Sequence, residues 1–407
     1  MSDEPFVIVG GGLAGAKAAE ALREQGFTGP VVLIAEESSL PYERPPLSKD
    51  YLAGKAERDS FVVHPAEWYA EHQVDLRRDT TVTAVDTAAH RVRLADGSEL
   101  GYAKLLLATG SRPRTLPLPG ADADGVLHLR RVEDADRIRS TISSISRLAV
   151  IGAGWIGLEV TAAARAAGVE VTVLESGELP LLRVLGSEVA TVFADLHAAN
   201  GVNFRFGVGV EEITTEQGRA TGVRLADGST VLADAVLVAV GAVPNVSLAV
   251  EAGLAVDGGV LVDAGLRTSD PDVFAVGDIA SQDHPVLKRR VRVEHWANAL
   301  NQPAVAATGM LGGSGVYSEL PYFFTDQYDL GMEYTGLAEP GDYDRVVFRG
   351  DVAAREFIAF WLSDNRVLAG MNVNVWDVTD GIKGLVGGGE QVDPNRLCDP
   401  DIPLGDV

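Results

Sequence analysis

The pattern of apolar and polar positions predicts a strand, a helix and a second strand at the start of the chain. Residues 6–9 and 31–34 are continuously apolar, which is typical of buried strands. Residues 13–25 carry apolar positions at helical spacing, and Gly26 is placed to end that helix. The order favours a βαβ unit, in which a helix connects two parallel strands.

Three glycines join the first strand to the helix with the spacing G-x-G-x-x-G. Gly10 suits the tight turn, Gly12 lets a pyrophosphate approach the backbone, and Gly15 lets the helix pack on the strand. The helix N-terminus presents N–H groups to the phosphates, and Glu36, after the second strand, is placed to bind a ribose. The combination predicts a dinucleotide site; an ordinary strand-to-helix turn is the alternative.

The same spacing recurs in the middle of the chain. Gly152, Gly154 and Gly157 follow an apolar run at residues 148–151 and open a helical segment that ends at Gly168. A second dinucleotide fingerprint is therefore present.

A repeated hexapeptide supports the same plan. Arg-Leu-Ala-Asp-Gly-Ser occurs at residues 93–98 and 224–229, and each Asp-Gly signals a hairpin turn between alternating strands. Each copy precedes a continuous apolar strand, at residues 104–110 and 234–241. Because all these elements repeat in one order, the chain is expected to hold two related nucleotide-binding domains.

The acid in the second repeat bears on cofactor choice. A strand at residues 169–174 is followed by Glu175, which favours a free 2′-hydroxyl and would repel a 2′-phosphate. We therefore expect NADH rather than NADPH, although Arg183 is close enough in sequence to weaken that preference.

Residues 41–49, Pro-Tyr-Glu-Arg-Pro-Pro-Leu-Ser-Lys, form a stiff segment because two adjacent prolines restrict the backbone. Arg44 and Lys49 either contact a cofactor here or are solvated charges of a surface loop. A short buried strand at residues 274–276 leads to Asp278, which either caps that strand or binds a polyol hydroxyl. A helix is predicted at residues 294–302.

The pattern changes near residue 317, where a smaller α+β domain with an antiparallel sheet is expected. Aromatic residues cluster at 321–328, and Asp364 and Asn365 supply a turn. A short helix at residues 381–386 and a polar tail end the chain. The expected strands cover residues 345–349, 357–362 and 367–373.

Composition restricts the function classes. With 34 basic and 58 acidic residues among 407, the net charge is 34 − 58 = −24, which disfavours nucleic acid and anionic membranes as partners. No apolar run reaches the roughly 18 residues of a membrane helix. The acidic residues 1–5 lead directly into the first strand, so no targeting peptide is expected. A cytoplasmic protein of two or three domains is predicted.

The single cysteine, Cys398, excludes an internal disulfide, a CxxC redox pair and a zinc cluster. No histidine has metal-ligand spacing, and we expect no metal site and a structural role for each. The seven histidines are His64, His72, His90, His128, His197, His284 and His295.

On these motifs, the whole chain resembles the FAD-dependent NADH:ferredoxin reductases of bacterial oxygenase systems, a branch of the pyridine nucleotide–disulfide oxidoreductase superfamily. The segment 41–49, Ala108-Thr109-Gly110, the Gly277-Asp278 strand end and residues 294–302 match the family, and the Arg-Pro-Pro-Leu-Ser-Lys signature is fairly specific to this branch.

The resemblance implies an α/β fold with two Rossmann-like domains, for FAD and NAD, and a C-terminal α+β interface domain. The FAD domain would cover residues 1–110 and 242–318, the NAD domain 111–241, and the interface domain 319–407. The resemblance places Lys49 near flavin N5, with Glu159 facing it across the nicotinamide site, and makes both catalytic. The implied cofactor contacts are Gly10, Gly12, Leu13, Ala14, Gly15, Glu36, Arg44, Lys49, Val82, Ala108, Thr109, Gly110, Arg130, Gly277, Asp278, Glu294, His295 and Trp296 for FAD, and Gly152, Gly154, Ile156, Gly157, Glu159, Glu175, Arg183 and Gly241 for NADH.

Disulfide reductases of this superfamily pass flavin electrons to a nearby cysteine pair. Because this chain has a single cysteine, its reduced flavin is expected to pass electrons to another protein. We expect hydride transfer from nicotinamide C4 to flavin N5, then two single-electron steps to an external [2Fe-2S] ferredoxin that serves an oxygenase. Lys49 would favour anionic reduced flavin, and Glu159 would orient Lys49; a merely structural tie between domains is the alternative. The chain departs from the family at Tyr322 and Phe324, where tryptophans are usual, which puts the electron-transfer detail and partner choice in doubt.

Docking of an acidic ferredoxin would need a basic surface on this acidic chain. Residues 288–292, Lys-Arg-Arg-Val-Arg, are the densest basic segment, and Arg366 and Lys383 are possible additions; a solvated face is the alternative. Two other functions stay open: a flavin NADH oxidase or peroxidase, and an NADH-sensing interaction protein that resembles apoptosis-inducing factor.

Overall fold

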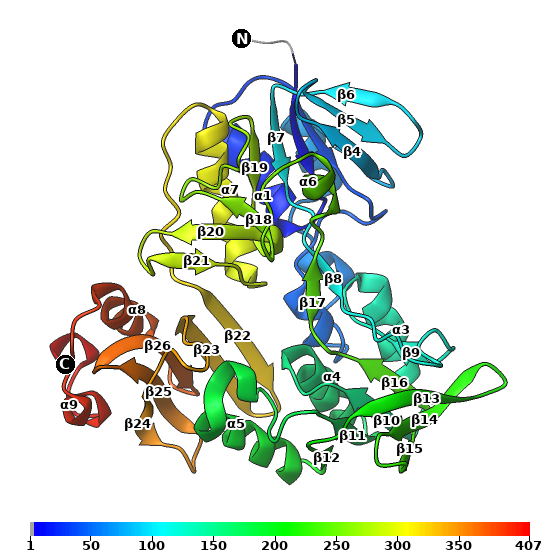
Figure 1. Ribbon diagram of the computed structural model, residues 1–407, viewed down its shortest axis with the longest axis vertical. Coiled ribbons are helices and arrows are strands. Elements are labelled where there is room, and N and C mark those ends of the chain that lie inside the picture. The colour runs from blue at the N-terminus through cyan, green and yellow to red at the C-terminus, as the bar shows by residue number, and fades with distance from the viewer. Residues whose placement is uncertain (1–3) are drawn as a thin grey trace. The chain divides into compact units, whose positions relative to one another are not determined.

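The structure is a computed structural model that describes residues 4–407. It consists of two compact units, each built from separate segments of the chain (Figure 1). The first unit contains Met1–Arg44, Glu57–Arg112 and Val243–Tyr322, and the second contains Pro45–Ala56, Pro113–Ala242 and Phe323–Val407. The chain changes unit after Arg44 and after Ala56, and again within β8 (Ser111–Pro113), β17 (Ala242–Pro244) and β22 (Tyr322–Gln327).

A five-stranded parallel sheet forms the centre of the first unit, in the order β19-β7-β1-β2-β3. Of its three inner strands, β1 and β2 are apolar and buried throughout and β7 is so after Lys104, as is typical of a parallel sheet covered on both faces. Helices α1 (Leu13–Glu24) and α7 (Trp296–Met310) pack against each other beside it (Figure 1). The strands are β1 (Phe6–Val9), β2 (Val31–Ile34), β3 (Val74–Arg77), β7 (Lys104–Leu107) and β19 (Val273–Ala275).

Two three-stranded sheets and short helices complete the first unit. The antiparallel sheet β4-β5-β6 contains the first hairpin, and the sheet β18-β20-β21 precedes α7. The strands are β4 (Val82–Asp86), β5 (Arg91–Leu94), β6 (Glu99–Gly101), β18 (Val260–Val262), β20 (Ala280–His284) and β21 (Arg289–Val291). The helices are α2 (Ala66–Glu71), α6 (Ser247–Glu251), η2 (Arg58–Phe61) and η3 (Gly277–Ile279).

The second unit contains another five-stranded parallel sheet, in the order β12-β11-β10-β16-β9. It is accompanied by the antiparallel sheet β13-β14-β15 and by three long helices. The strands are β9 (Val126–Leu127), β10 (Arg147–Ile151), β11 (Glu170–Leu174), β12 (Asn203–Arg205), β13 (Val210–Glu216), β14 (Arg219–Leu225), β15 (Thr230–Leu232) and β16 (Ala235–Val238). The helices are η1 (Pro45–Ser48), α3 (Val132–Ile142), α4 (Trp155–Ala166) and α5 (Leu182–Ala199).

The two parallel sheets follow one plan, as the repeated sequence predicts. In both, the strand before the glycine turn pairs in parallel with the strand after the helix and with the strand after the hairpin. The hairpin turns share a side-chain geometry: Ser98 donates to Asp96 through its hydroxyl at 2.6 Å, and Ser229 donates to Asp227 at 2.6 Å. Identical hexapeptides therefore form equivalent turns.

The C-terminal part of the second unit is an antiparallel sheet in the order β22-β23-β26-β25-β24. Trp361, fully buried in this sheet, donates from Nε1 to the Leu185 carbonyl of α5 at 3.0 Å. One apolar core thus includes side chains from the parallel sheet and from this C-terminal sheet. The elements are β22 (Tyr322–Gln327), β23 (Leu330–Gly336), β24 (Arg345–Asp351), β25 (Glu356–Ser363), β26 (Arg366–Val373), α8 (Thr379–Gly388), α9 (Pro394–Cys398) and η4 (Leu404–Asp406).

The α/β fold class, with two Rossmann-like domains and a C-terminal α+β part, is confirmed. Two local predictions were wrong. The helix expected at residues 294–302 instead runs from Trp296 through Pro303 to Met310, because the buried side chains of Ala306, Ala307 and Met310 keep its C-terminal half on the core.

The tail after the helix at residues 381–386 was expected only to be polar, yet it contains a further helix, α9. Asp393 caps α9 by accepting from the Asn395 N–H at 2.9 Å, Pro394 occupies the first helical position, and Leu397 is fully buried. Within residues 4–407 we find no helix with the length and apolarity that a bilayer crossing requires. The prediction about targeting peptides concerns residues 1–5, of which residues 1–3 lie outside the described part.

Candidate functional site

In each glycine fingerprint, two glycines lie so close to backbone atoms that no side chain would fit, and the third has free space around it. A Cβ on Gly10 would lie 2.1 Å from the Ala108 carbonyl oxygen, and one on Gly15 would lie 2.0 Å from the Gly10 oxygen. A Cβ on Gly12 would meet nothing within 4 Å. Gly10 and Gly15 therefore keep the loop close to the sheet and helix, and Gly12 leaves space outside it.

The second fingerprint reproduces this geometry. A Cβ on Gly152 would lie 2.4 Å from the Ala239 oxygen, one on Gly157 would lie 2.3 Å from the Gly152 oxygen, and Gly154 is open within 4 Å. Gly12 and Gly154 are the N-cap residues of α1 and α4, and neither helix has an acid in its first turn. Both helix ends thus have room and polarity for a phosphate, and the residues present fit two dinucleotides.

The acids at the second-strand ends differ in their surroundings. Glu36 is exposed after β2. Glu175 is half-buried and accepts from the backbone N–H groups of Ala153 and Gly177, each at 2.8 Å. The Glu175 carboxylate therefore fixes the glycine loop of its own domain, a contact that the sequence pattern does not reveal.

Asp278 lies beside the N-terminal end of α1 in the first unit. A Cβ on Gly277 would lie 3.6 Å from that of Ala14, and the Gly277 N–H donates to buried Gln302 at 2.8 Å. Ser111 donates to the Asp278 carboxylate at 2.6 Å. The strand end, the first glycine loop and α7 thus bring these predicted residues together.

Arg44 and His295 lie within electrostatic reach of Asp278. Burial is the largest influence on Arg44 and disfavours its charge, yet Tyr42, Glu37 and Asp278 outweigh burial and raise its pKa. Arg44 donates to Glu37 at 2.8 Å. Burial lowers the pKa of His295 to about 4, although Asp278 opposes this, so His295 is neutral at neutral pH.

The remaining predicted FAD contacts occupy the same unit, except Lys49 and Arg130, which belong to the second unit. Trp296 donates from Nε1 to Glu43 at 2.8 Å, and Thr109 donates to the Asn245 carbonyl at 2.7 Å. Glu294 forms an ion pair with Arg292 at 2.5 Å. Val82 is buried in β4, whereas Arg130 belongs to the second unit, where its backbone N–H donates to Asp134 at 2.9 Å.

A buried carboxylate in the second unit accepts hydrogen bonds from three side chains. Glu159, on α4, is 4% exposed and accepts from Lys49 Nζ at 2.8 Å, from Thr325 Oγ1 at 2.5 Å and from the Ser48 hydroxyl. The Lys49 ammonium also lies 5.3 Å from the centre of the Phe324 ring. The predicted pair Lys49–Glu159 is therefore in direct contact, and its aromatic neighbour is one of the two positions where tryptophan is usual.

Sequence reasoning missed Ser48 and Thr325. Ser48 adjoins Lys49 in the proline-stiffened segment, which was a usable signal. Thr325 alternates with Phe324 along β22, so its side chain points to the other face of the strand, but no local pattern indicates Glu159 as its partner.

The other predicted NADH contacts lie near the second glycine loop or farther along its domain. Ile156, in the first turn of α4, is 42% exposed although it is apolar. Gly241 follows β16 with φ +101° and open surroundings. Arg183 is exposed in the first turn of α5.

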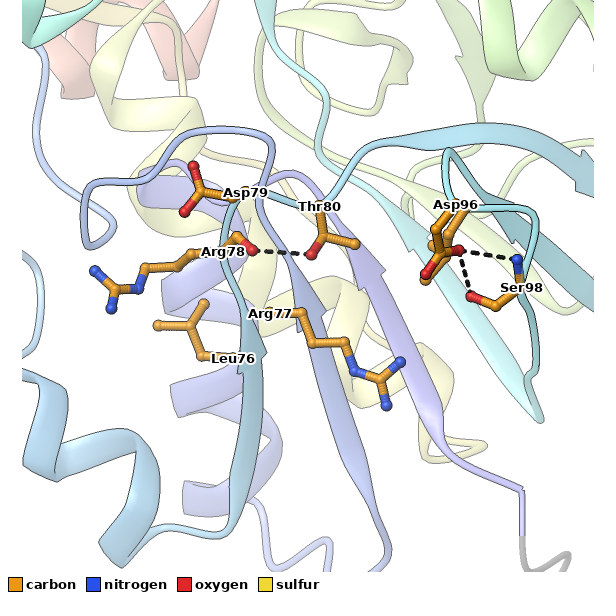
Figure 2. A pocket seen from close by; sticks show the side chains of 8 residues that line it. Leu76, Arg77, Arg78, Asp79, Thr80, Asp96 and Ser98 are labelled. Carbon is orange, nitrogen blue, oxygen red and sulfur yellow. Dashed lines mark hydrogen bonds between the residues drawn. The ribbon is translucent and has the colours of Figure 1, made fainter.

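An open hollow of about 510 Å³ lies at the carboxyl end of β3, beside the first hairpin (Figure 2). Figure 2 shows Arg77, Arg78 and Asp79 on one side, and Asp96 with its hydrogen bonds to Ser98 on the other. The residues that line it belong to neither glycine loop and include neither Lys49 nor Glu159. This hollow is therefore separate from the predicted cofactor and catalytic residues.

Two family models match the chain. The model of the pyridine nucleotide-disulphide oxidoreductases matches residues 4–302, and the model of the reductase C-terminal domain matches residues 322–407. The ferredoxin–NAD(+) reductase component of the anthranilate 1,2-dioxygenase system from Burkholderia cepacia is 43% identical over 406 residues, which is 99% of each chain. Putidaredoxin reductase from Pseudomonas putida is 38% identical over 411 residues, covering 100% of this chain and 97% of the relative.

A solved structure agrees with this similarity. The reductase in the covalent putidaredoxin reductase–putidaredoxin complex matches with a TM-score of 0.95 at 38% identity, covering 100% of this chain and 98% of that chain. Fold, glycine loops and full-length similarity agree, and they confirm the resemblance and the expectation of FAD and NADH as cofactors. The chain belongs to the pyridine nucleotide-disulphide oxidoreductases, in the branch of FAD-dependent ferredoxin reductases.

Proposed function

We propose that the chain is an FAD-dependent NADH:ferredoxin reductase that delivers electrons singly to a [2Fe-2S] ferredoxin serving an oxygenase, either a haem monooxygenase or a Rieske dioxygenase. The observation that carries the proposal is the pair of glycine loops with one open position each, at Gly12 and Gly154, in a chain with a single cysteine. When bound, FAD converts a hydride from NADH into electrons that can leave one at a time.

The residues of each loop would hold one dinucleotide. The Gly12 backbone and the N-terminus of α1 would bind the FAD pyrophosphate, Asp278 a polyol hydroxyl, and Arg44 and Trp296 other parts of FAD. The Gly154 backbone and the N-terminus of α4 would bind the NADH pyrophosphate. Glu175, at the end of β11, disfavours a 2′-phosphate by its charge, which supports NADH over NADPH.

Lys49 and Glu159 are the proposed catalytic pair. The Lys49 ammonium would stabilise negative charge that develops on the reduced cofactor, and Glu159 would set the ammonium's direction through their 2.8 Å contact. The side chains are 13% and 3% exposed, so solvent screens the interaction only weakly.

We also propose the domain limits and the compartment. An FAD domain of residues 1–110 and 242–318, an NAD domain of 111–241 and an interface domain of 319–407 are supported by the repeated strand order and by the change to an antiparallel sheet at β22. A cytoplasmic location is supported by the single cysteine, which suits a reducing compartment.

The basic segment 288–292 is the proposed docking site for an acidic ferredoxin. It lies at the tip and second strand of the hairpin β20–β21. Arg290 donates to the neutral carbonyl groups of Ser281 and Val262, whereas the charge of Arg292 is paired with Glu294. Arg290 is therefore the stronger candidate for attracting an acidic partner.

The test is NADH-dependent reduction of cytochrome c with and without a [2Fe-2S] ferredoxin purified from the source cell. We expect fast reduction only when both this protein and the ferredoxin are present. Fast NADH consumption with oxygen alone would favour a flavin oxidase. Slow turnover with every acceptor, together with stable NADH binding, would favour an NADH-sensing interaction protein.

A further inference from the structure

The Glu159 carboxylate lies at the end of a line of buried polar side chains in the second unit. Thr325 Oγ1 lies 2.5 Å from Glu159 Oε1, and Gln327 Nε2 lies 3.2 Å from Thr325 Oγ1. Gln327 Oε1 lies 2.8 Å from His197 Nε2, and the Tyr328 hydroxyl lies 3.3 Å from His197 Nδ1. Thr325 and Gln327 are each 1% exposed and His197 is 0% exposed, so these three side chains are shielded from water, whereas Tyr328 at the far end is half-buried.

The carboxylate fixes the direction of every hydrogen bond in the line. An ionised carboxylate only accepts, so the Thr325 hydroxyl must donate to it. The Thr325 oxygen then accepts from the amide nitrogen of Gln327, which turns the Gln327 oxygen towards His197. His197 must therefore carry its proton on Nε2, and its Nδ1 accepts from Tyr328. Each dipole thus points its positive end towards Glu159.

This arrangement keeps one protonation state over the working pH range. Burial lowers the pKa of His197 to about 4, although its hydrogen bond to Gln327 opposes the change, and burial raises the pKa of Tyr328 to about 12. Neither group titrates near neutral pH, and a primary amide separates His197 from Thr325. The line is therefore a fixed set of donors and does not deliver protons.

Both favourable and unfavourable charges surround Glu159. Lys49 contacts Glu159 Oε1, the same oxygen that accepts from Thr325, while Ser48 donates to Oε2. Asp326 opposes the charge of Glu159: burial is the main cause that raises the pKa of Asp326, Lys49 acts against this, and Glu159, Asp50 and Glu333 add to the increase. Because one oxygen is shared by Lys49 and Thr325, the carboxylate's orientation sets the position of the ammonium.

We propose that Thr325, Gln327 and His197 are positioning residues for the reduction step with NADH. They hold the Glu159 carboxylate in one orientation, and Glu159 in turn holds Lys49. Polarisation along a buried chain strengthens its last hydrogen bond, which is the contact made by Thr325. The inference rests on the proposed function, because it takes Lys49 and Glu159 as the catalytic pair.

Thr325→Val removes the last donor and keeps the side-chain shape. At saturating NADH, we expect the rate of bleaching of the flavin absorbance to fall roughly tenfold, the effect of losing one hydrogen bond to a charged group, with NADH affinity changed less than twofold. Thr325→Ser restores the donor and should recover most of the rate. Thr161→Val is the matched control, since Thr161 is buried two residues from Glu159 on α4 and its hydroxyl finds no partner within residues 4–407.

A double substitution separates positioning from general disturbance. In a Glu159→Gln background, Thr325→Val should cause no further loss of rate, because its effect passes through the carboxylate. Nitrogen NMR of the holoprotein gives a second readout: His197 should be neutral with its proton on Nε2 from pH 6 to 8. Three results would each overturn the proposal. They are equal rates of flavin bleaching in Thr325→Val and Thr161→Val, an undiminished effect of Thr325→Val in the Glu159→Gln background, and a His197 proton on Nδ1.

Failure of this inference is distinct from failure of the proposed function. Both readouts use the protein with FAD and without ferredoxin. If no ferredoxin accepts electrons while Thr325→Val still slows reduction by NADH, the proposed function is wrong and the positioning role stands. If ferredoxin is reduced and the two valine variants react equally fast, only the positioning role is wrong.

Discussion

The open position of the second glycine loop gives a sharp test of where NADH binds. Gly154 has φ −83° and ψ −178°, which alanine adopts without strain, and an added Cβ would meet nothing within 4 Å. Gly154→Ala should therefore fold normally, with a cost below about 1 kcal/mol for replacing glycine at an N-cap. The same methyl group would occupy the space through which a pyrophosphate approaches the first turn of α4.

The expected loss of affinity follows from the hydrogen bonds that such an approach forms. A hydrogen bond to a charged group contributes about 1.5–3 kcal/mol, and each 1.4 kcal/mol is a factor of ten in affinity. Losing one should weaken NADH binding roughly 10- to 100-fold, with FAD content and thermal midpoint unchanged. The measurements are the NADH dependence of the initial rate with an artificial electron acceptor, the visible absorbance of the flavin, and a melting curve.

Two matched variants complete the test. In Gly157→Ala the Cβ would lie 2.3 Å from the Gly152 oxygen, so the backbone must shift, and we expect destabilisation of about 1–3 kcal/mol instead of a selective loss of NADH. Gly12→Ala should lower FAD content as Gly154→Ala lowers NADH affinity. If stable, FAD-loaded Gly154→Ala binds NADH within twofold of the unaltered protein, the assignment of the second loop is refuted.

Three further predictions concern charge. Lys49→Ala should slow flavin reduction by NADH at least tenfold in stopped-flow measurements, because the ammonium that would stabilise charge on the reduced cofactor is lost; a rate within about twofold would contradict its role. His197 has its folded-state pKa lowered from 6.5 to about 4, so its contribution to stability is complete above pH 6.5 and is lost as the pH falls towards 4, by up to about 3 kcal/mol. Melting curves should therefore show that lowering the pH from 6.5 to 4 decreases the stability of His197→Asn less than that of the unaltered protein. Equal decreases in stability would contradict this role of His197. The apparent affinity for ferredoxin should fall as salt rises, and Arg290→Gln should weaken it more than Arg292→Gln, whose charge is already paired; no change with salt would exclude electrostatic docking at the segment 288–292.

The sequence was sufficient for the repeated architecture because the constraints are local. Gly10 and Gly152 lie against carbonyl oxygens of neighbouring strands at distances that exclude any side chain, so the spacing of glycines is tied to the turn itself. The hairpins are equally local, since each serine bonds to an aspartate two residues before it. Where the backbone geometry depends on neighbours in sequence, the pattern predicts it well.

The surroundings of Glu159 could not be predicted in this way. Its partners Ser48 and Thr325 are 111 and 166 residues away in sequence, and Thr325 lies in a segment whose most visible feature is its aromatic residues. His197 was expected to be merely structural because no local motif surrounds it. Such contacts arise from tertiary packing, and a single sequence contains no periodicity that reports them. The helix α9 is different, because its start signal, Asp393 followed by Pro394, is local in the sequence.

The Lys49–Glu159 pair explains why these distant partners matter. The two charges cancel, so at a distance the pair contributes little field, and any catalytic effect depends on which way the ammonium points. The chain offers no thiol as a substitute: Cys398 lies on α9, burial raises its pKa, and one cysteine cannot store two electrons as an internal disulfide. With Lys49 and Glu159 in their proposed roles, reduction depends on the direction of this ion pair, and substitution of Thr325, which contacts the shared carboxylate oxygen, should also slow it.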